Sequence, residues 1–304
     1  MLRFKLLGSA AGGGVPQWNC SCELCDLSRR QPAVVPPRLQ LQAAVAGDGE
    51  RWILLNASPD LRAQIEATPE LQPALAAGPR NTPIEAIVLT CADLDQVLGI
   101  LLLREFQPLT VYATALVQKT LEANSFFRVM HRVPNQLTWI TITAGELFAL
   151  GSSGVSCTPI SLSAALPFYA KELNANAEED ATIGLLLESD GKRIAYTPAV
   201  PEITANLKAL YNTCHSILVD GTFWSDTELT GTQAGTPTAR AIGHVPLSGP
   251  EGTIELLADV TQPEKMFVHI NNTNPVLDPR SSEYRAVITA GWQIGYDGWQ
   301  LNWK

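Results

Sequence analysis

Three cysteines, Cys20, Cys22 and Cys25, lie within six residues of one another and give the most specific chemical signal in the sequence. Zinc prefers thiolate ligands, and three thiolates on a short loop can face one point of a tetrahedral site. Three free thiols are the weaker interpretation, because reduced thiols this close together would chelate metal in any case. The sequence therefore predicts a structural zinc ion held by a loop at residues 18–27.

The fourth zinc ligand is not identified by this pattern. The chain has four histidines, His131, His215, His244 and His269, and an Asn, an Asp or a backbone group would also be compatible with the site. His131 and His215 have no polar neighbours in sequence that suggest a site, and we expect both to be structural.

Carboxylates follow two apolar segments that are predicted to be buried strands. Asp93 and Asp95 come after residues 84–89, and Asp220 comes after residues 216–219. Side chains at the ends of such strands usually face the cleft of an α/β protein, where a carboxylate can bind metal or transfer protons. For Asp93 or Asp95 alone, capping of the following helix is an equally good interpretation.

Two histidines are the remaining candidates. His269 ends an apolar strand and begins the sequence HINNTNP, whose density of amide side chains exceeds what a simple loop needs. His244 stands alone in the loop at residues 242–245, where a histidine is more often a surface or satisfied residue. The glycine-rich turn at residues 8–14 lacks the GK[ST] ending of a phosphate loop, so a tight passage of backbone beside the site is the favoured interpretation.

The elements that must position these residues are mostly strands and helices in alternation. Strands are predicted at residues 2–7, 39–45, 52–55, 84–89, 109–112, 139–142, 155–162, 183–187, 193–196, 216–219 and 265–270. Helices are predicted at residues 60–67, 94–103, 115–123, 203–210 and 253–260. Residues 171–180 and 227–237 are predicted to be loops. Antiparallel strands followed by strand–helix alternation occur twice, which indicates an α/β fold of the αββα sandwich type in one domain, residues 1–304.

Composition limits the classes of partner. The 21 Lys and Arg residues are outnumbered by 30 Asp and Glu residues, the net charge is −9, and no basic cluster is evident, so nucleic acid is not an expected partner. No apolar run approaches the roughly 18 residues of a membrane span, and the N-terminal apolar stretch is too short for a signal peptide. We therefore expect a cytoplasmic protein whose cysteines form no disulfides.

Seven segments together resemble the pyrroloquinoline quinone (PQQ) biosynthesis protein B family, PqqB. They are GSAAGGG at 8–14, PQWNC at 16–20 with Cys22 and Cys25, NASPD at 56–60, LRE at 103–105, DGT at 220–222, GH at 243–244 and HINNTNP at 269–275. The resemblance extends from the first strand to Asp297-Gly298. It implies the metallo-β-lactamase superfamily and hence the αββα sandwich, with Zn²⁺ in the C-x-C-x-x-C site.

The resemblance also bears on the reaction. The superfamily motif H-x-H-x-D-H aligns with Cys91, Asp93, Asp95 and Gln96, and PqqB usually retains a final Asp-His, so Gln96 departs even from this family. The usual bridging aspartate is replaced at Thr197-Pro198. These replacements argue against a metal-dependent hydrolase with two zinc ions.

The remaining ligands suit a different metal. His244 and His269 with one carboxylate, Asp93 or Asp220, would form the two-histidine, one-carboxylate set that suits Fe²⁺ and O₂, and Asp95 or Asp220 would move protons. The resemblance implies an iron-dependent oxygenase that hydroxylates the tyrosine ring of a glutamate–tyrosine crosslinked precursor. A non-catalytic carrier of PQQ or a precursor toward export is the alternative. Other PQQ biosynthesis proteins remain open as partners, as does a homodimer.

Overall fold

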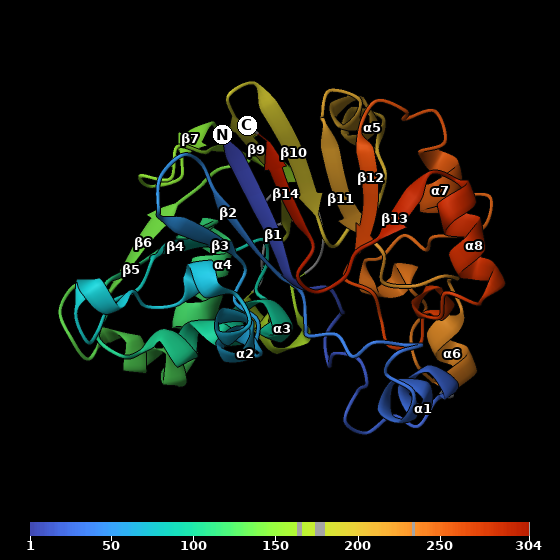
Figure 1. The fold of residues 1–304 in the computed structure, drawn as a ribbon, viewed down its shortest axis with the longest axis horizontal. Helices are drawn as coiled ribbons and strands as arrows, with labels where there is room; N and C mark the ends of the chain where they lie inside the picture. The colour runs from blue at the N-terminus through green and yellow to red at the C-terminus, as the bar shows by residue number, and fades with distance from the viewer. Residues whose placement is uncertain (163–165, 174–179, 233–234, 304) are drawn as a thin grey trace. The chain divides into compact units, whose positions relative to one another are not determined.

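A computed structural model describes residues 1–162, 166–173, 180–232 and 235–303, which divide between two compact units. The first unit consists of Met1–Leu7, Gln42–Gly191 and Gly298–Lys304, and the second of Gly8–Leu41 and Lys192–Asp297. Each unit therefore assembles from segments that are far apart in the sequence (Figure 1). The predicted single domain spanning residues 1–304 stays a prediction.

The first unit contains a mixed sheet with the strand order β14-β1-β2-β3-β4-β5-β6. Its strands are β1 (Leu2–Gly8), β2 (Gln42–Ala46), β3 (Trp52–Leu55), β4 (Ile84–Val88), β5 (Leu109–Ala113), β6 (Leu137–Thr141) and β14 (Gln300–Trp303). β2 and β3 pair antiparallel, whereas β3 to β6 pair in parallel. β4 is buried except at Glu85, as expected for a parallel strand covered on both faces.

A second ladder in this unit is antiparallel and runs β9-β8-β7. Its strands are β7 (Phe148–Ala149), β8 (Ser156–Ser161) and β9 (Ile183–Ser189).

Short helices cover the sheet of the first unit. They are α2 (Leu61–Glu66), α3 (Leu94–Val97), α4 (Ala115–Glu122), and the 3₁₀ helices η1 (Pro69–Leu71), η2 (Leu75–Ala77), η3 (Leu98–Leu103), η4 (Ser125–His131) and η5 (Phe168–Leu173). Leu61, Val97 and Val117 from the three α-helices are buried in the same cluster as strand residues such as Ile87 and Val111. The helix predicted at residues 94–103 is present, but it is divided into α3 and η3.

The second unit is built on a parallel ladder with the strand order β13-β12-β11-β10. The strands are β10 (Lys192–Thr197), β11 (Ser216–Asp220), β12 (Glu264–Val268) and β13 (Trp292–Ile294). Its helices are α1 (Glu23–Arg30), α5 (Ala205–Tyr211), α6 (Glu228–Thr232), α7 (Thr253–Leu256), α8 (Ser282–Thr289), η6 (Arg240–Ile242) and η7 (Pro275–Leu277). Parallel strands end at the same edge of a sheet. Asp220, which ends β11, and His269, which follows β12, therefore lie on the same side of the ladder.

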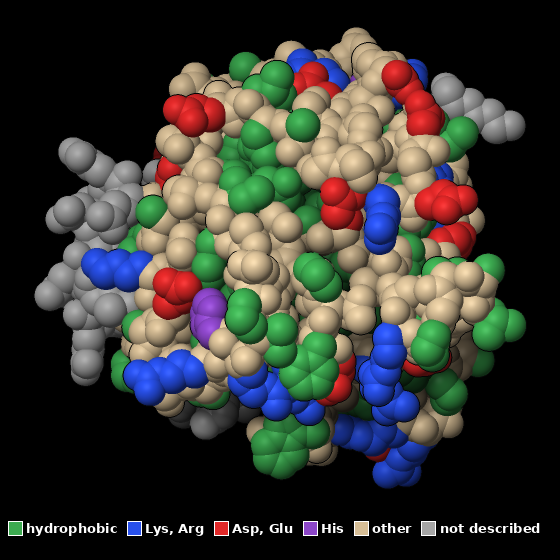
Figure 2. All heavy atoms as spheres, turned by 90° about the vertical axis from the view of Figure 1, so that its left-hand side faces the viewer, with side chains coloured by type: hydrophobic (Ala, Val, Ile, Leu, Met, Phe, Trp, Pro, Cys, Tyr) green, Lys and Arg blue, Asp and Glu red, His purple; other side chains and the backbone are tan. Residues whose placement is uncertain are grey.

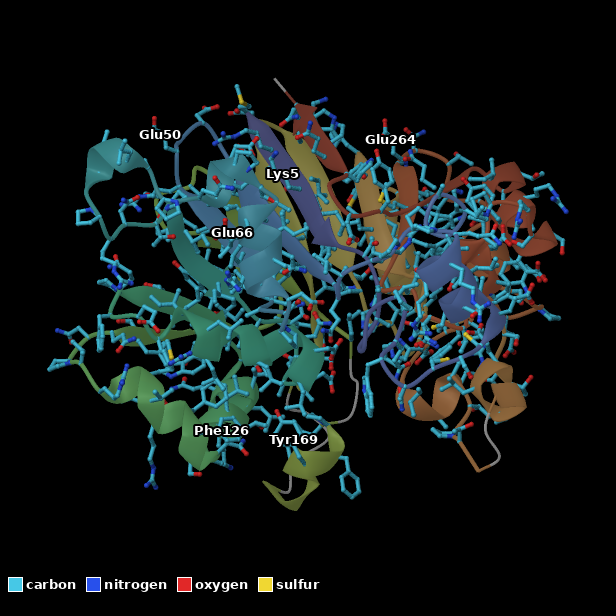
Figure 3. The ribbon with its side chains drawn as sticks, turned by 60° about the horizontal axis from the view of Figure 1, so that its bottom comes forward. Lys5, Glu50, Glu66, Phe126, Tyr169 and Glu264 are labelled. Carbon is cyan, nitrogen blue, oxygen red and sulfur yellow. The ribbon has the colours of Figure 1, made fainter. Side chains whose placement is uncertain are left out.

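Two loop predictions differ from the structure. The loop predicted at residues 227–237 is wrong in its first half, where α6 forms, although Thr and Gly favour helices weakly. Part of the loop predicted at residues 171–180 lies outside the described residues, and the backbone at its start belongs to η5. Figure 3 labels the side chain of Tyr169 in η5, and its hydroxyl donates a hydrogen bond to the carbonyl of Ala92.

Among the described residues, no helix combines the length and the apolar character needed to cross a membrane.

Candidate metal centres

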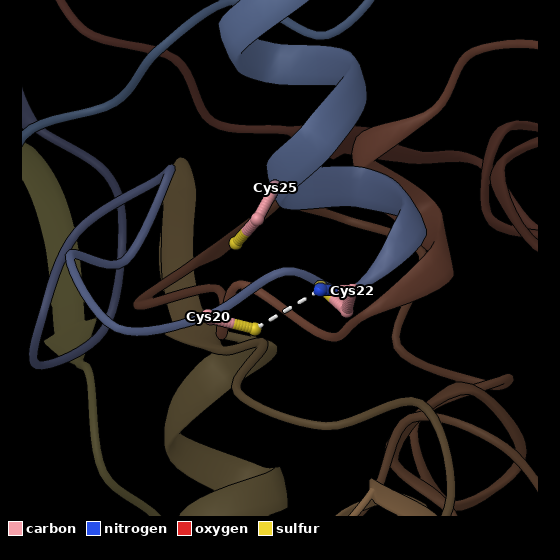
Figure 4. A group of neighbouring side chains, drawn as sticks. All are labelled: Cys20, Cys22 and Cys25. Carbon is pink, nitrogen blue, oxygen red and sulfur yellow. Dashed lines mark hydrogen bonds between the residues drawn. The ribbon is translucent and has the colours of Figure 1, made fainter.

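The three predicted zinc ligands converge on one point in the second unit, and we call Cys20, Cys22 and Cys25 the cysteine cluster (Figure 4). Their sulfur atoms lie within 4.8 Å of one another. Cys22 occupies the N-cap position of α1 and Cys25 lies in its first turn, while the Cys22 backbone N–H donates to Cys20 Sγ at 3.4 Å. Arg29 holds the loop by donating to the carbonyl oxygens of Cys20 and Gln17, each at 2.6 Å.

The thiols of the cysteine cluster differ in acidity. Burial raises the pKa of Cys20, but hydrogen bonds from the Cys22 backbone and from the side chains of Cys22, Cys25 and Asn272 outweigh burial and hold that pKa below its usual value. Burial raises the pKa of Cys22 to about 11. A cation binds thiolates, so its binding to the cluster would release the protons that the thiols carry.

Asn272 supplies the fourth polar group that the sequence left unidentified. Its side chain is buried, with 3% exposure, and its amide nitrogen donates to Cys25 Sγ at 3.3 Å and contacts Cys22 Sγ at 3.9 Å. The two ends of an amide have the same shape, so a cation among the sulfurs would be faced by the Asn272 oxygen instead of its NH₂ group. Three thiolates and one amide oxygen fit a four-coordinate zinc site.

A second group of ligands, Asp220, His244 and His269, also lies in the second unit, and we call it the histidine cluster. Asp220 ends β11, His269 directly follows β12, and His244 follows η6. Each residue offers a ligand atom within 4.8 Å of the others. The two imidazole rings are stacked with their centroids 5.5 Å apart. Three of the five residues that were predicted from the sequence to be catalytic, Asp220, His244 and His269, therefore lie together in the structure.

Asp220 is fully engaged by hydrogen bonds and has only 1% exposure. Its oxygens accept from His244 Nδ1 at 2.7 Å, from Val200 N at 2.9 Å, and from the backbone and hydroxyl of Thr222 at 3.0 and 2.6 Å. Burial raises its pKa, but His244, His269 and Thr222 outweigh burial and hold the pKa below its usual value. Asp220 is therefore an ionised carboxylate that orients its neighbours.

These contacts determine which ring nitrogens face a metal. An ionised Asp220 only accepts, so the hydrogen between it and His244 resides on His244 Nδ1. Thr222 donates its hydroxyl hydrogen to Asp220, so its contact of 2.8 Å with His269 Nδ1 requires the hydrogen to be on His269. Imidazoles protonated at Nδ1 bind metal through Nε2, with the Nδ1 partner fixing the ring. Two oriented imidazoles fit a transition-metal ion such as Fe²⁺ or Zn²⁺.

Thr222 and Glu228 were not predicted from the sequence as site residues. Thr222 contacts all three members of the histidine cluster, and its only signal was its place after Asp220-Gly221. Glu228, in α6, accepts from Trp224 N at 2.6 Å and from the Thr273 hydroxyl at 2.5 Å. Burial raises the pKa of Glu228 despite these donors. No sequence signal marked Glu228, because it lies in a segment predicted to be a loop.

Asp93 and Asp95 belong to the first unit, where they flank the start of α3. Asp93 occupies the N-cap position, but its side chain makes no capping hydrogen bond. It adjoins Cys91, whose thiol pKa is raised well above its usual value, by burial first and by the charge of Asp93 second. The predicted roles of Asp93 and Asp95 in metal binding and proton transfer stay predictions.

Gln96, at the position of a superfamily histidine, is buried in a network of amides. Its Oε1 accepts from Asn56 Nδ2 at 2.7 Å, and its Nε2 donates to Asp95 at 2.7 Å. Asn56 Nδ2 also donates to Thr90 at 2.9 Å. Both ends of Gln96 thus have partners, which argues against a role as a metal ligand.

The glycine-rich turn lies against the histidine cluster as a tight backbone passage. Ala11 N donates to the carbonyl of Ile270 at 2.9 Å, and Ile270 N donates to the carbonyl of Ser9 at 3.0 Å. Gly14 has a φ of +68°, and a side chain at this position would place its Cβ 3.1 Å from the Arg38 carbonyl oxygen, so a larger residue would be strained.

The two remaining histidines lie outside these clusters. His131 lies 3.9 Å from Glu122, and His215 Nδ1 accepts from Arg193 N at 3.3 Å.

Comparisons with known proteins agree with this arrangement. The family model of the beta-lactamase superfamily domain matches residues 51–270. Coenzyme PQQ synthesis protein B of Methylorubrum extorquens (strain PA1) is 42% identical over 299 residues, 98% of each chain. The protein of the same name from Bradyrhizobium diazoefficiens (strain JCM 10833) is 40% identical over 311 residues, 99% of each chain.

Solved structures show the same fold. The crystal structure of Zn²⁺-bound PqqB from Methylobacterium extorquens has a TM-score of 0.90 and 40% identity, with 99% of this chain and 100% of that chain covered. A diphosphatase of the PhnP family has a TM-score of 0.67 at 19% identity, with 100% and 98% covered, which shows the fold alone. The predicted αββα sandwich is confirmed, and the chain belongs to the coenzyme PQQ synthesis protein B family of the beta-lactamase superfamily.

Proposed function

We propose that this protein acts in PQQ biosynthesis as an iron- and O₂-dependent hydroxylase of the tyrosine ring in the glutamate–tyrosine crosslinked precursor. Relatives at 40–42% identity over nearly the whole chain carry the name coenzyme PQQ synthesis protein B, which supports the pathway. The observation that carries the reaction is the histidine cluster, in which the buried carboxylate of Asp220 orients His244 and the Thr222 hydroxyl orients His269.

Zinc belongs to the cysteine cluster in this proposal. The PqqB structure from Methylobacterium extorquens is Zn²⁺-bound, and Cys20, Cys22, Cys25 and Asn272 form a donor set of the kind that zinc selects. A site closed by four protein ligands is typical of structural zinc, which leaves the reaction to the histidine cluster.

His244 and His269 would hold Fe²⁺ through Nε2, and the bound metal would supply O₂ activation. Asp220 fixes the His244 ring and, as a buried carboxylate, stabilises a proton on that imidazole. Asp220 is the carboxylate that lies beside both imidazoles.

The proposed reaction is tested with protein reconstituted anaerobically with Fe²⁺. A tyrosine-type precursor is added with isotopically labelled O₂ and ascorbate, because inserting one oxygen atom into a ring C–H requires two electrons and two protons to reduce the other oxygen to water. Mass spectrometry should show one labelled oxygen in the product. His269→Ala should abolish the product, whereas His131→Ala should retain it. A folded, iron-loaded protein that yields no labelled product refutes the hydroxylase.

Hydrolysis by two zinc ions is the less favoured function. The positions that align with the superfamily motif hold Cys91, Asp93, Asp95 and Gln96, and Gln96 is enclosed by its amide network. Thr197, at the position of the usual bridging aspartate, is fully buried and lies 2.6 Å from the Tyr211 hydroxyl. We expect no turnover of a generic phosphodiester or lactam in the presence of Zn²⁺.

A carrier of PQQ or a precursor toward export is the second candidate. The enclosed Gln96 favours it, because loss of an imidazole at that position removes a metal ligand. A carrier would bind PQQ saturably in equilibrium dialysis, without turnover, and would bind equally well after chelators had removed metal from the histidine cluster.

A further inference from the structure

A short segment, residues 269–274, contacts both metal-ligand clusters of the second unit. Its first residue, His269, belongs to the histidine cluster, and Asn272, three positions later, lies on the cysteine cluster. We call residues 269–274 the linking segment.

The backbone of His269 adopts a conformation that is unfavourable for a residue with a side chain. Its φ is +59°, in the left-handed region that residues with a side chain seldom adopt. Such a conformation persists only when the surrounding contacts hold it. If the contacts around the linking segment loosened, His269 would relax to negative φ and its ring would leave the histidine cluster.

On one side, the linking segment is held by the cysteine cluster. Asn272 Nδ2 donates to Cys25 Sγ at 3.3 Å, and Cys22 Sγ lies 3.8 Å from the Asn272 carbonyl oxygen. Both the side chain and the backbone of Asn272 therefore face sulfur. An ion that draws the three sulfurs together would fix Asn272 more firmly than three thiols do.

On the other side, the linking segment is held by the loop after β11. Asn271 N donates to the Thr222 carbonyl at 3.0 Å, and the Thr222 hydroxyl lies 2.8 Å from His269 Nδ1. Asn274, fully buried, donates to the Gly221 carbonyl at 2.9 Å. A displacement of Asn272 would thus be transmitted to residues that orient His269.

We propose that a metal ion on the cysteine cluster tightens metal binding at the histidine cluster, with Asn272 as the positioning residue that transmits the effect to His269. The inference rests on the metal-binding part of the proposed function but not on the reaction. The coupling involves two states of the protein. When the cysteine cluster is occupied, His269 is held at positive φ; when the cysteine cluster is empty, His269 is free to relax to negative φ. Coupling of this kind typically changes an affinity about 5- to 150-fold.

The experiment measures the Co²⁺ affinity of the histidine cluster by its d–d absorption. In one sample, the cysteine cluster is filled with one equivalent of Zn²⁺. In the other, it is disabled by Cys22→Ser with Cys25→Ser. The absence of sulfur-to-cobalt charge-transfer absorption shows that Co²⁺ is not bound to cysteine. We expect the dissociation constant to be at least fivefold lower with zinc in place.

Two amide variants separate coupling from general damage to the fold. Asn272→Ala keeps the three thiolate ligands but removes the amide that contacts sulfur, so the Asn272→Ala protein, with its zinc content confirmed by elemental analysis, should bind Co²⁺ as weakly as the zinc-free protein. Asn271→Ala is the matched control, because its side chain contacts Thr273 and not sulfur. The Asn271→Ala protein should keep the difference between its zinc-loaded and zinc-free forms. Circular dichroism confirms the fold of each variant.

Linkage requires the effect to be reciprocal. Co²⁺ on the histidine cluster should raise the zinc affinity of the cysteine cluster by the same factor, as measured by competition with a chromophoric chelator. Equal Co²⁺ affinities with and without zinc, or no Co²⁺ binding at the histidine cluster, would overturn the proposal. Failure of hydroxylation with coupling intact would refute only the proposed reaction.

Discussion

Thr222 carries a hydroxyl that contacts Asp220, His244 and His269 at 2.6, 3.2 and 2.8 Å. At the scale of single residues, this contact explains how two imidazoles from different loops present the same nitrogen. The sequence identified the ligands by their chemical type. It could not identify Thr222, because a threonine acquires this role only when three separate segments meet around it.

Replacing Thr222 by valine keeps the shape of the side chain and removes the hydroxyl. We expect Thr222→Val to weaken metal binding at the histidine cluster by about 10- to 100-fold, since partners that orient metal-binding histidines have effects of this size. The buried Asp220 would also lose one donor, which costs about 1–3 kcal/mol of stability. Calorimetric metal titration and urea unfolding measure the two effects.

Thr230→Val is the control for this prediction. Thr230 is exposed and its hydroxyl donates to the Thr227 carbonyl at 2.7 Å, away from the cluster. A metal affinity that is unchanged in Thr222→Val would show that the hydroxyl does not orient the imidazoles.

Cys22→Ser tests the cysteine cluster. The variant should lose one equivalent of bound zinc, because a neutral hydroxyl does not replace a thiolate as a ligand. The variant should also lose the free energy of unfolding that zinc binding adds. This contribution is about 2.7–4.1 kcal/mol at free zinc concentrations of 100 to 1,000 times the dissociation constant. Elemental analysis and thermal unfolding measure both quantities. Cys157→Ala, in β8, should keep its zinc. Full zinc content in Cys22→Ser would contradict the assignment.

At the scale of elements, Asp297 is the last residue of the second unit and its hydrogen bonds connect this end of the unit to the glycine-rich turn. Its carboxylate accepts from Ser9 Oγ and from Leu39 N, each at 2.7 Å. Arg38 is half-buried beside it and donates to Ser9 Oγ at 3.2 Å. These bonds hold in place the backbone that passes beside Ile270, next to His269.

Burial raises the pKa of Asp297 above its ordinary value of 3.8, although Leu39, Ser9 and Arg38 oppose this shift. A raised pKa means that the folded protein binds the proton more tightly than the unfolded protein. The stability contributed by protonated Asp297 is therefore present below about pH 4 and is lost as pH rises through the folded-state pKa.

Asp297→Asn should remove this pH dependence. Compared with the variant, the wild type should lose unfolding free energy as pH rises from about 4. Urea unfolding of both proteins at a series of pH values measures the difference. If the free energy of unfolding of the wild type, minus that of Asp297→Asn, were constant or increased as pH rises, the pKa of Asp297 would not be raised.

Most strands and the helices α2, α3, α4, α5 and α7 could be predicted, because their burial follows from alternation and spacing along the chain, whereas α8 was not predicted. α1 was missed, since its residues are mostly charged and polar and it is held by the cysteine loop. α6 was also missed, because its Thr- and Gly-containing sequence favours a loop and the bonds to Glu228 come from Trp224 and Thr273.

At the scale of the whole molecule, charge limits the partners. The net charge is −9, and acidic and basic side chains are both present on the face shown in Figure 2. Binding to nucleic acid is driven by the release of counterions as Lys and Arg neutralise phosphates, and a net negative charge disfavours it.

We therefore expect no binding to a labelled DNA duplex at about 150 mM salt. Fluorescence anisotropy measures this directly, and a basic DNA-binding protein serves as the positive control. Saturable binding that weakens with added salt would contradict the expectation.

The sequence by itself determined the family, the fold class and the cysteine cluster, because these depend on local spacing and on motifs that remain contiguous in the chain. The tertiary structure decided which carboxylate joins His244 and His269, which nitrogens face a metal, and that Asn272 lies on the sulfurs. The physical reason is that hydrogen-bond partners from distant segments have no spacing in sequence. They are defined only when the strands β11 and β12 bring their following loops to one edge.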